Sequence, residues 1–377
     1  MSIDLELNPS TAHIISFAAI RVDDQEPLVF RRGRIADALR ELDRAARSVG
    51  YLLGHNFIHF DRVHLEAAGA GPEILKKPII DTLWLNPLAF PRNPYHHLVK
   101  HYQDGRLQGG HVNDPELDAR LVFEVLANQI GALSALNQSS PDSLLAFHWL
   151  TATRARDVGF DALFSTIRRC RRPGASEAKA AIHRLLEDQA CHEQIRNILD
   201  AAEQSGWSLA YALAWISVAG SDSVMPPWVR HQFPETRSLV RQLRDTPCSD
   251  PSCMWCRVQS DPGSLLKQWF GFDNFRQEPA DKDGRPLQEA IAAAVMAGEN
   301  VLGILPTGTG KSVCYQLPAL ARFHKTGDLT VVISPLVALM ADQLAGLQRQ
   351  GISSCVAING LLSLPERHHA LDQVRLG

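Results

Sequence analysis

The feature that most constrains this sequence is the loop LPTGTGKS, Leu305–Ser312, which lies between the apolar run NVLGI and the helix-like segment VCYQLPALARF. A strand, a glycine-rich turn and a helix N-terminus in this order point backbone N–H groups and the positive helix end at one place, where phosphates can bind. We expect Lys311 to reach the β- and γ-phosphates of a nucleotide and Ser312 to hold Mg²⁺. The other expected contacts come from Thr307, Gly308, Thr309 and Gly310.

Three further segments surround this loop in a fixed order. WFGFDNFR begins at Trp269, Gln288 follows it, and VVISPLVALMADQL begins at Val331 in a run, LTVVISP, that is typical of a buried strand. Together with PTGTGKS they resemble the aromatic entry segment and motifs 0, I and Ia of RecQ-family superfamily 2 helicases, in which the loop commonly lacks the first glycine, here Leu305. The resemblance implies an ATP-dependent 3′-to-5′ DNA helicase with Gln288 recognising adenine.

The helicase motifs that would complete a motor are missing from this sequence, which ends at VRLG. Phosphoryl transfer needs a carboxylate that holds Mg²⁺ and positions water, and usually an arginine that neutralises charge in the transition state. The sequence contains neither a DEAH-like motif after the loop nor the motifs of a second RecA-like domain. We therefore expect residues 264–377 to be the first part of a RecA-like domain, in a fragment that binds ATP without turning it over.

Acidic residues recur in three separate segments of the N-terminal region. Asp4 and Glu6 begin a strand-like run, Asp61 ends GHNFIHFD, and Asp118 lies on the helix predicted for NDPELDARL. Converging carboxylates can hold two divalent cations about 4 Å apart, one activating water and one stabilising the leaving 3′ oxygen. The segments resemble the motifs of DEDD 3′-to-5′ exonucleases, which implies an RNase H-like α/β domain over residues 1–135 that uses Mg²⁺ or Mn²⁺.

The general base of such a nuclease separates two functional alternatives. In the commonest DEDD subtype a histidine shortly before the last aspartate deprotonates the metal-bound water, and here Asn113 occupies that position. His111 lies nearby in GGHVNDP and is the candidate replacement. Either the domain is a weak exonuclease, or it is a catalytically dead module that docks DNA for the motor. Both alternatives make DNA the partner, as single strands and as 3′-ended or forked duplexes.

A cysteine cluster lies near the end of a region rich in Ala, Leu, Arg and Glu, for which we predict a helical connector over residues 136–263. The segment CSDPSCMWC places Cys248, Cys253 and Cys256 at a spacing that suits thiolate ligands of Zn²⁺ or of an iron–sulfur cluster. The candidates for a fourth ligand are Cys191, His192 and His231. The alternative is a set of buried or free cysteines.

Charge and composition restrict the remaining possibilities. The net charge of −3 gives no overall basic bias, so contacts with DNA must come from local patches such as the arginines of IRRCRRPG, for which a solvated helix end is the alternative. The 7 cysteines are not spaced like a secreted disulfide framework, and no continuous apolar run is long enough for a membrane span. We expect a cytoplasmic protein, associated with the nucleoid if bacterial, that has no membrane partner.

Overall fold

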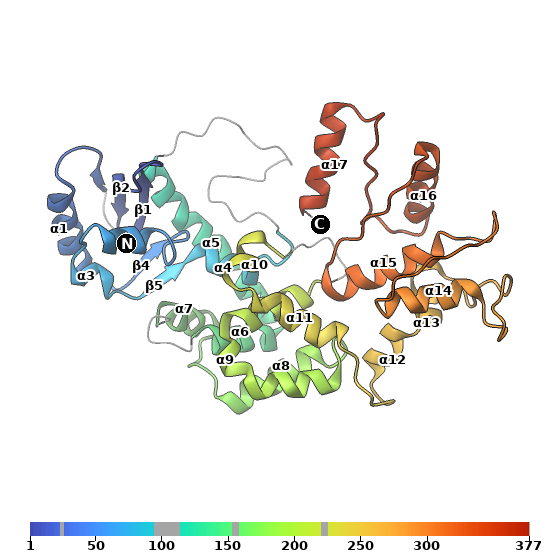
Figure 1. The fold of residues 1–377 in the computed structure, drawn as a ribbon. Coiled ribbons are helices and arrows are strands. Elements are labelled where there is room, and N and C mark those ends of the chain that lie inside the picture. Colours follow the sequence, from blue (N-terminus) through green and yellow to red (C-terminus); the bar gives the residue numbers. More distant parts are fainter. Residues whose placement is uncertain (23–25, 94–113, 153–157, 220–224, 377) are drawn as a thin grey trace. The chain divides into compact units, whose positions relative to one another are not determined.

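The computed structural model describes residues 1–22, 26–93, 114–152, 158–219 and 225–376 of the chain (Figure 1). These residues divide into two compact units. The first comprises Met1–Ile182 and Ala202–Ala214, and the second comprises His183–Ala201 and Trp215–Gly377. The unit boundaries fall within two helices, α8 (Ala175–Leu186) and α9 (His192–Ile216). Each unit has its own arrangement of elements and its own core.

A five-stranded mixed sheet of order β3-β2-β1-β4-β5 forms the base of the first unit. Its strands are β1 (Ser2–Leu7), β2 (Ile14–Ile20), β3 (Leu28–Phe30), β4 (Leu52–Gly54) and β5 (Ile79–Asp81). The central strand β1 pairs antiparallel with β2 and parallel with β4, and β4 pairs parallel with β5. Because successive side chains of a strand point to opposite faces, Ile3 and Leu5 lie on one face of β1 while Asp4 and Glu6 lie on the other.

Helices complete the first unit. On the face of Ile3 and Leu5, helix α1 (Ile35–Ala46), α2 (Asp61–Ala67) and α3 (Pro72–Leu75) contribute Leu39, Leu42, Leu65 and Ile74 to the main core. On the other face, α5 (Pro115–Ser139) packs against β1 and β2, and its Ala119 joins a second small core with Ala18 and Ile20. The predicted α/β layer fold of the N-terminal region is therefore present, with the acidic side chains of β1 directed towards α5.

A cluster of aromatic side chains joins the remaining helices of the first unit, α4 (Thr82–Ala89), α6 (Pro141–Thr151) and α7 (Val158–Arg168), to the second half of α9. The ring of Trp84 stacks with Phe160 and meets Trp207 edge-on at a centroid distance of 4.9 Å. The hydroxyl of Tyr211 donates a hydrogen bond to the Trp84 carbonyl at 3.0 Å. Helix α9 bends at Gly206, whose φ of 43° favours glycine.

Helix α5 has a length and an apolar composition that would also suit a membrane span. Its residues Ala119, Val122 and Leu133 are buried within the first unit, and Asp118 is 7% exposed. A long core helix of a globular domain meets the same criterion of length and hydropathy.

The regular elements described in the second unit are all helices. After the first half of α9 it contains α10 (Pro227–Gln232), α11 (Glu235–Asp245), α12 (Met254–Ser260), α13 (Pro262–Phe270), α14 (Leu287–Met296), α15 (Val313–Thr326), α16 (Val337–Arg349) and α17 (Leu364–Leu376). Its core gathers Leu265, Leu266 and Phe270 of α13 with Leu317 and Leu320 of α15. The apolar faces of these amphipathic helices thus cover one another.

The strands predicted on both sides of the phosphate loop do not form. Leu302 and Ile304 of the NVLGI run are 88% and 82% exposed, and Ile333 of the LTVVISP run is 93% exposed. No β-strand occurs among the described residues of the second unit. An extended apolar segment becomes a buried strand only where neighbouring strands satisfy its backbone and cover its side chains, and the described part of this unit offers none. The buried-strand prediction was therefore wrong for these residues.

Candidate functional site

Three of the four predicted carboxylates meet on the sheet of the first unit. Carboxylate oxygens of Asp4, Glu6 and Asp118 lie within 4.8 Å of one another. Asp4 and Glu6 share one face of the central strand β1, and Asp118 lies in the first turn of α5, which packs on that face. Oxygen ligands from separate elements are what Mg²⁺ and Mn²⁺ prefer, so this group of three could bind a divalent cation.

The fourth predicted carboxylate, Asp61, lies beside this group of three but not within it. Asp61 begins α2 and is 2% exposed. Its Oδ1 accepts a hydrogen bond from the Leu5 N–H at 3.0 Å, which fixes the start of α2 against the middle of β1. The negative charge of Asp61 nevertheless reaches Asp4, because it is one of the causes that raise the Asp4 pKa. Asp61 therefore contributes to the electrostatics of the site through its charge.

Burial and mutual repulsion shift the acidity of these groups. Burial, followed by the charges of Asp61, Asp118 and Glu6, raises the pKa of Asp4 from 3.8 to about 9. Burial, followed by the charge of Asp81, raises the pKa of Asp61 to about 8. Carboxylates this close can all ionise only when a cation offsets their repulsion. Binding of a metal ion at this site would therefore release protons.

This exchange predicts a pH-dependent affinity for Mn²⁺. Because the pKa of Asp4 is raised in the folded state, the protonated form of Asp4 stabilises the metal-free fold. This contribution to stability is lost as the pH rises from about 4 through about 9. Mn²⁺ competes with the proton for the carboxylate. We expect the affinity for Mn²⁺ to increase by up to about tenfold per pH unit between pH 6 and pH 8, if one proton leaves per ion bound. Titration calorimetry at three pH values measures this slope, and an affinity that does not change with pH would contradict the exchange.

Asp81 is a further acidic residue of this region, and its role is to shape the loop before α2. Its carboxylate accepts hydrogen bonds from the backbone N–H groups of Asn56 and Ile58, each at 2.9 Å, and of Leu83 at 3.0 Å. Burial raises the Asp81 pKa to about 6 against the opposing effect of these donors. Asn56 has a φ of 64°, so the chain reverses sharply here. Asp81 thereby positions the turn that leads to Asp61.

The candidate general base His111 and the neighbouring Asn113 lie outside the residues that the structure describes. Their assignment stays a prediction from the sequence. The described first turn of α5 begins at Pro115, and Asp114 caps it by accepting the Glu116 N–H at 3.1 Å.

The phosphate loop of the second unit leads directly into α15. Gly308 and Gly310 have φ values of 81° and 76°, in the left-handed region that favours glycine. The Lys311 ammonium group donates to the Leu305 carbonyl at 3.0 Å, so it lies across the loop from its own backbone. Ser312 is the N-cap of α15 and forms no side-chain cap hydrogen bond, which is consistent with a hydroxyl that serves a ligand. The loop thus brings its lysine and its hydroxyl to one helix N-terminus.

Gln288 on α14 holds this loop in place. It is 4% exposed, and its Nε2 donates to the carbonyls of Thr309 at 2.6 Å and Gly310 at 3.0 Å. Its Oε1 accepts the backbone N–H of Arg276 at 3.1 Å, and the Arg276 guanidinium donates to the Gly308 carbonyl at 2.6 Å. A Cβ atom at Gly310 would lie 2.8 Å from Gln288 Nε2. The residue expected to recognise adenine therefore contacts the loop itself in this structure.

Two of the arginines in IRRCRRPG form hydrogen bonds inside the first unit. The Arg168 guanidinium donates to His148 Nδ1 at 2.9 Å, and that of Arg172 donates to the Trp149 carbonyl at 2.9 Å. Arg169 and Arg171 are exposed. The segment therefore holds the end of α7 against α6, and only part of it faces solvent.

The predicted cysteine cluster gains a fourth member in the second unit. The sulfur atoms of Cys248, Cys253 and Cys256 lie with that of Cys191, and all four are within 4.8 Å of one another. The two histidines proposed as alternatives, His192 and His231, do not belong to this group.

The second unit contains a stretch that matches a known family. Residues 285–375 match the sequence model of the DEAD/DEAH box helicase family. The matched stretch includes α14, the phosphate loop, α15 and α16. This stretch is therefore similar to part of a DEAD/DEAH box helicase domain.

More specific similarity comes from three curated relatives. The mouse protein "ATP-dependent DNA helicase Q5" is 41% identical over 112 residues, which cover 29% of this chain and 10% of that protein. "ATP-dependent DNA helicase RecQ" of Bacillus subtilis is 40% identical over 114 residues, which cover 30% of this chain and 17% of that protein. The human "ATP-dependent DNA helicase Q4" is 41% identical over 91 residues, which cover 24% of this chain and 7% of that protein.

These similarities support a RecQ-type superfamily 2 helicase. The matched stretch spans less than a fifth of the length of each of these three relatives. No solved structure matches the chain.

Proposed function

We propose that this chain takes part in ATP-dependent 3′-to-5′ unwinding of DNA, with a fused, weak, metal-dependent 3′-to-5′ exonuclease, in DNA repair or recombination in the cytoplasm. The observation that carries the helicase part is the phosphate loop and its Gln288 contacts, within a stretch similar to RecQ helicases. ATP and Mg²⁺ or Mn²⁺ are the proposed cofactors, and single-stranded, 3′-ended or forked DNA is the proposed partner. A metal ion or iron–sulfur cluster at Cys248, Cys253 and Cys256 is part of the same proposal.

The helicase proposal predicts a preference for adenine nucleotides. Gln288 can offer a donor and an acceptor to the adenine edge once it exchanges its contacts with Arg276 and Thr309. A guanine edge presents the opposite pattern of donors and acceptors. We expect a fluorescent ATP analogue to bind at least about tenfold more tightly than the matching GTP analogue, for the loss of one to two hydrogen bonds.

The measurement is a fluorescence titration of the full chain in the presence of Mg²⁺. Gln288→Glu keeps the side-chain shape but replaces the amide donor by an acceptor, so this variant should lose the preference for ATP. Gln277→Glu, in the preceding segment, is the matched control and should keep it. Equal binding of both nucleotides by the unmodified chain would overturn the adenine assignment.

The nuclease proposal rests on the group Asp4, Glu6 and Asp118 with Asp61 beside it, and on the raised pKa values of Asp4 and Asp61. Two-metal nucleases use carboxylates from separate elements in this way. The alternative is a DNA-docking module without catalysis, which Asn113 in place of the usual base favours. A digestion of 3′-labelled single-stranded DNA with Mg²⁺ or Mn²⁺ distinguishes the two, because only the enzyme releases labelled nucleotides.

A further inference from the structure

Four cysteine sulfurs form a compact group in the second unit. Cys191 comes from the turn before α9, Cys248 from the loop after α11, and Cys253 and Cys256 from the N-terminus of α12. Cys191, Cys253 and Cys256 are buried. The sulfurs of Cys248 and Cys256 are 3.8 Å apart, which is too far for a disulfide, where the sulfurs are about 2 Å apart. Segments far apart in the sequence therefore supply four thiols to one small volume.

The distances fit one tetrahedral metal ion. With Zn–S bonds of about 2.3 Å, the sulfurs of a tetrahedral site lie about 3.8 Å from one another. The distance between Cys248 and Cys256 equals this value, and all four sulfurs lie within 4.8 Å of one another. An iron–sulfur cluster would place several iron and sulfide ions between the thiolates and would hold them farther apart. The geometry thus favours a single ion over a cluster.

Backbone N–H groups directed at the sulfurs provide a second, independent observation. The Cys248 N–H donates to the Cys256 sulfur at 3.4 Å. The backbone N–H groups of Cys256 and His192 donate to the Cys253 sulfur. Such N–H donors stabilise thiolates and orient them as ligands. The sulfur of a neutral thiol is a weaker acceptor of such hydrogen bonds.

We propose that Cys191, Cys248, Cys253 and Cys256 bind one Zn²⁺ ion tetrahedrally, and that this ion braces the C-terminal end of the phosphate-loop helix α15. The inference deepens the metal site proposed above by naming its fourth ligand, its metal and its structural consequence. It concerns a site that precedes the helicase-like stretch in the sequence.

Trp255 and Arg244 connect the proposed zinc site to the end of α15. Trp255 lies between two ligands in the sequence, and its indole N–H donates to the Arg244 carbonyl at 3.1 Å. The Arg244 guanidinium lies 4.4 Å from the centroid of the Trp255 ring and donates to the carbonyls of His324 and Lys325 at 2.9 and 3.0 Å. Arg244 is 1% exposed, and burial lowers its pKa to about 10, so it stays charged at neutral pH. A cation at the last carbonyls of a helix stabilises that helix end.

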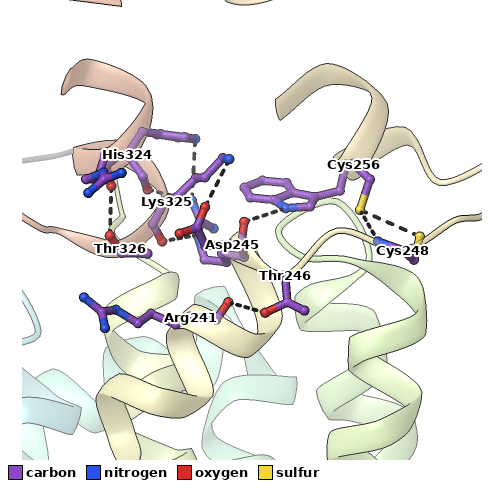
Figure 2. Close-up of polar contacts among 11 residues, drawn as sticks. Arg241, Asp245, Thr246, Cys248, Cys256, His324, Lys325 and Thr326 are labelled. Atoms are coloured by element: carbon purple, nitrogen blue, oxygen red, sulfur yellow. Dashed lines mark hydrogen bonds and ion pairs between the residues drawn. The ribbon is translucent and has the colours of Figure 1, made fainter. Parts of the chain in front are cut away.

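The other ligand segment reaches the same place. The Cys191 N–H donates to the Leu243 carbonyl at 2.9 Å, directly before Arg244. Asp245, next in the sequence, pairs with Lys325 at 3.2 Å, and Figure 2 draws this ion pair together with the contact between Cys248 and Cys256. Asp328, just beyond α15, pairs with arginines of α11. Both metal-bound segments thus hold the end of α11 against the end of α15.

The first test is the metal content of the full chain, purified without chelator and measured by elemental analysis. We expect about one zinc per chain, no iron and no visible absorption. Cys191→Ser should lower the zinc content at least several-fold, as Cys256→Ser should, whereas Cys170→Ser, an exposed cysteine outside the group, should retain it. If Cys256→Ser loses its zinc while Cys191→Ser retains all of it, Cys191 is not a ligand, but the site formed by the other three cysteines stands. Absence of any metal from the unmodified chain would overturn both, and iron with visible absorption would overturn the zinc assignment.

The second test measures how strongly zinc stabilises the end of α15. It uses the unmodified chain, so its outcome does not depend on whether a variant folds. Zinc is removed with a chelator and then added back, and amide hydrogen exchange is followed in each state. We expect exchange to accelerate at least about tenfold in the last turn of α15 and the end of α11 on removal, and to recover with zinc. Unchanged exchange in α15, with zinc demonstrably removed, would overturn the brace while leaving the ligand assignment standing.

Discussion

Replacing Lys311 with alanine is expected to abolish measurable binding of Mg·ATP at micromolar concentrations. The ammonium group of Lys311 lies across the phosphate loop, where it donates a hydrogen bond to the Leu305 carbonyl. A bound triphosphate would place several negative charges at this position. Loss of the hydrogen-bonded ion pair between this lysine and the phosphates costs about 2 kcal/mol, which corresponds to a loss in affinity of roughly 30-fold.

The measurement is a titration with a fluorescent ATP analogue, and the matched control is Lys282→Ala. Lys282 is an exposed lysine outside the loop, so its loss removes the same charge without touching the site. The control should bind as the unmodified chain does. An equal loss in both variants would mean that overall charge governs the affinity, and no loss in Lys311→Ala would contradict the assignment of the loop.

Asp118→Asn is expected to remove the metal-dependent digestion of single-stranded DNA. Asp118 is 7% exposed and lies within 4.8 Å of the carboxylates on β1, so the amide would take a negative charge away from the proposed metal ions. Loss of a metal ligand at a two-metal site costs about 4 kcal/mol in the transition state, or about 10³-fold in rate. The matched control is Glu124→Gln, an exposed acid on the same helix α5, which should leave the rate unchanged.

The docking alternative gives a different result in the same assay. If the domain is a non-catalytic module, the unmodified chain should bind labelled 3′ ends and release no nucleotide. The mobility shift of the labelled DNA should then be smaller with Asp118→Asn. Asn113→His would then also fail to release nucleotide, whereas in a weak enzyme it should raise the rate by about 10²- to 10⁴-fold by restoring a base. Cleavage that persists unchanged in Asp118→Asn would contradict both proposals for this site.

The sequence predicted the features that depend on neighbouring residues better than the contacts between distant parts of the chain. The alternation of side chains along β1 and the start of the helix at Pro115 depend on nearby residues. The structure brings Asp4, Glu6 and Asp118 together, as these patterns suggest. The sequence left Cys191 as one of three candidates for the fourth ligand, because its place beside the other cysteines depends on the contact of the turn before α9 with the end of α11.

Other features depend on contacts that no local pattern records. Arg244 belongs to the strongly amphipathic helix α11 and would be expected at its surface, yet partners about eighty positions further along the chain bury it. Gln288 matches a nucleotide-recognition motif, but its hydrogen bonds to the loop follow from how α14 packs against α15. The apolar run before Pro335 resembles a strand by composition alone, and composition cannot supply a neighbouring strand.

The exposed run from Leu329 to Ile333 also bears on how the protein behaves in concentrated solution. This segment contains β-branched residues, carries no charge and includes no proline, and its backbone is not paired in a sheet. Short segments of this kind pair readily with identical segments of other molecules and thereby start aggregation. Asp328 and Pro335, which flank the run, are residue types that oppose such pairing. The solubility of the chain should therefore depend on these flanking residues more than on its modest net charge.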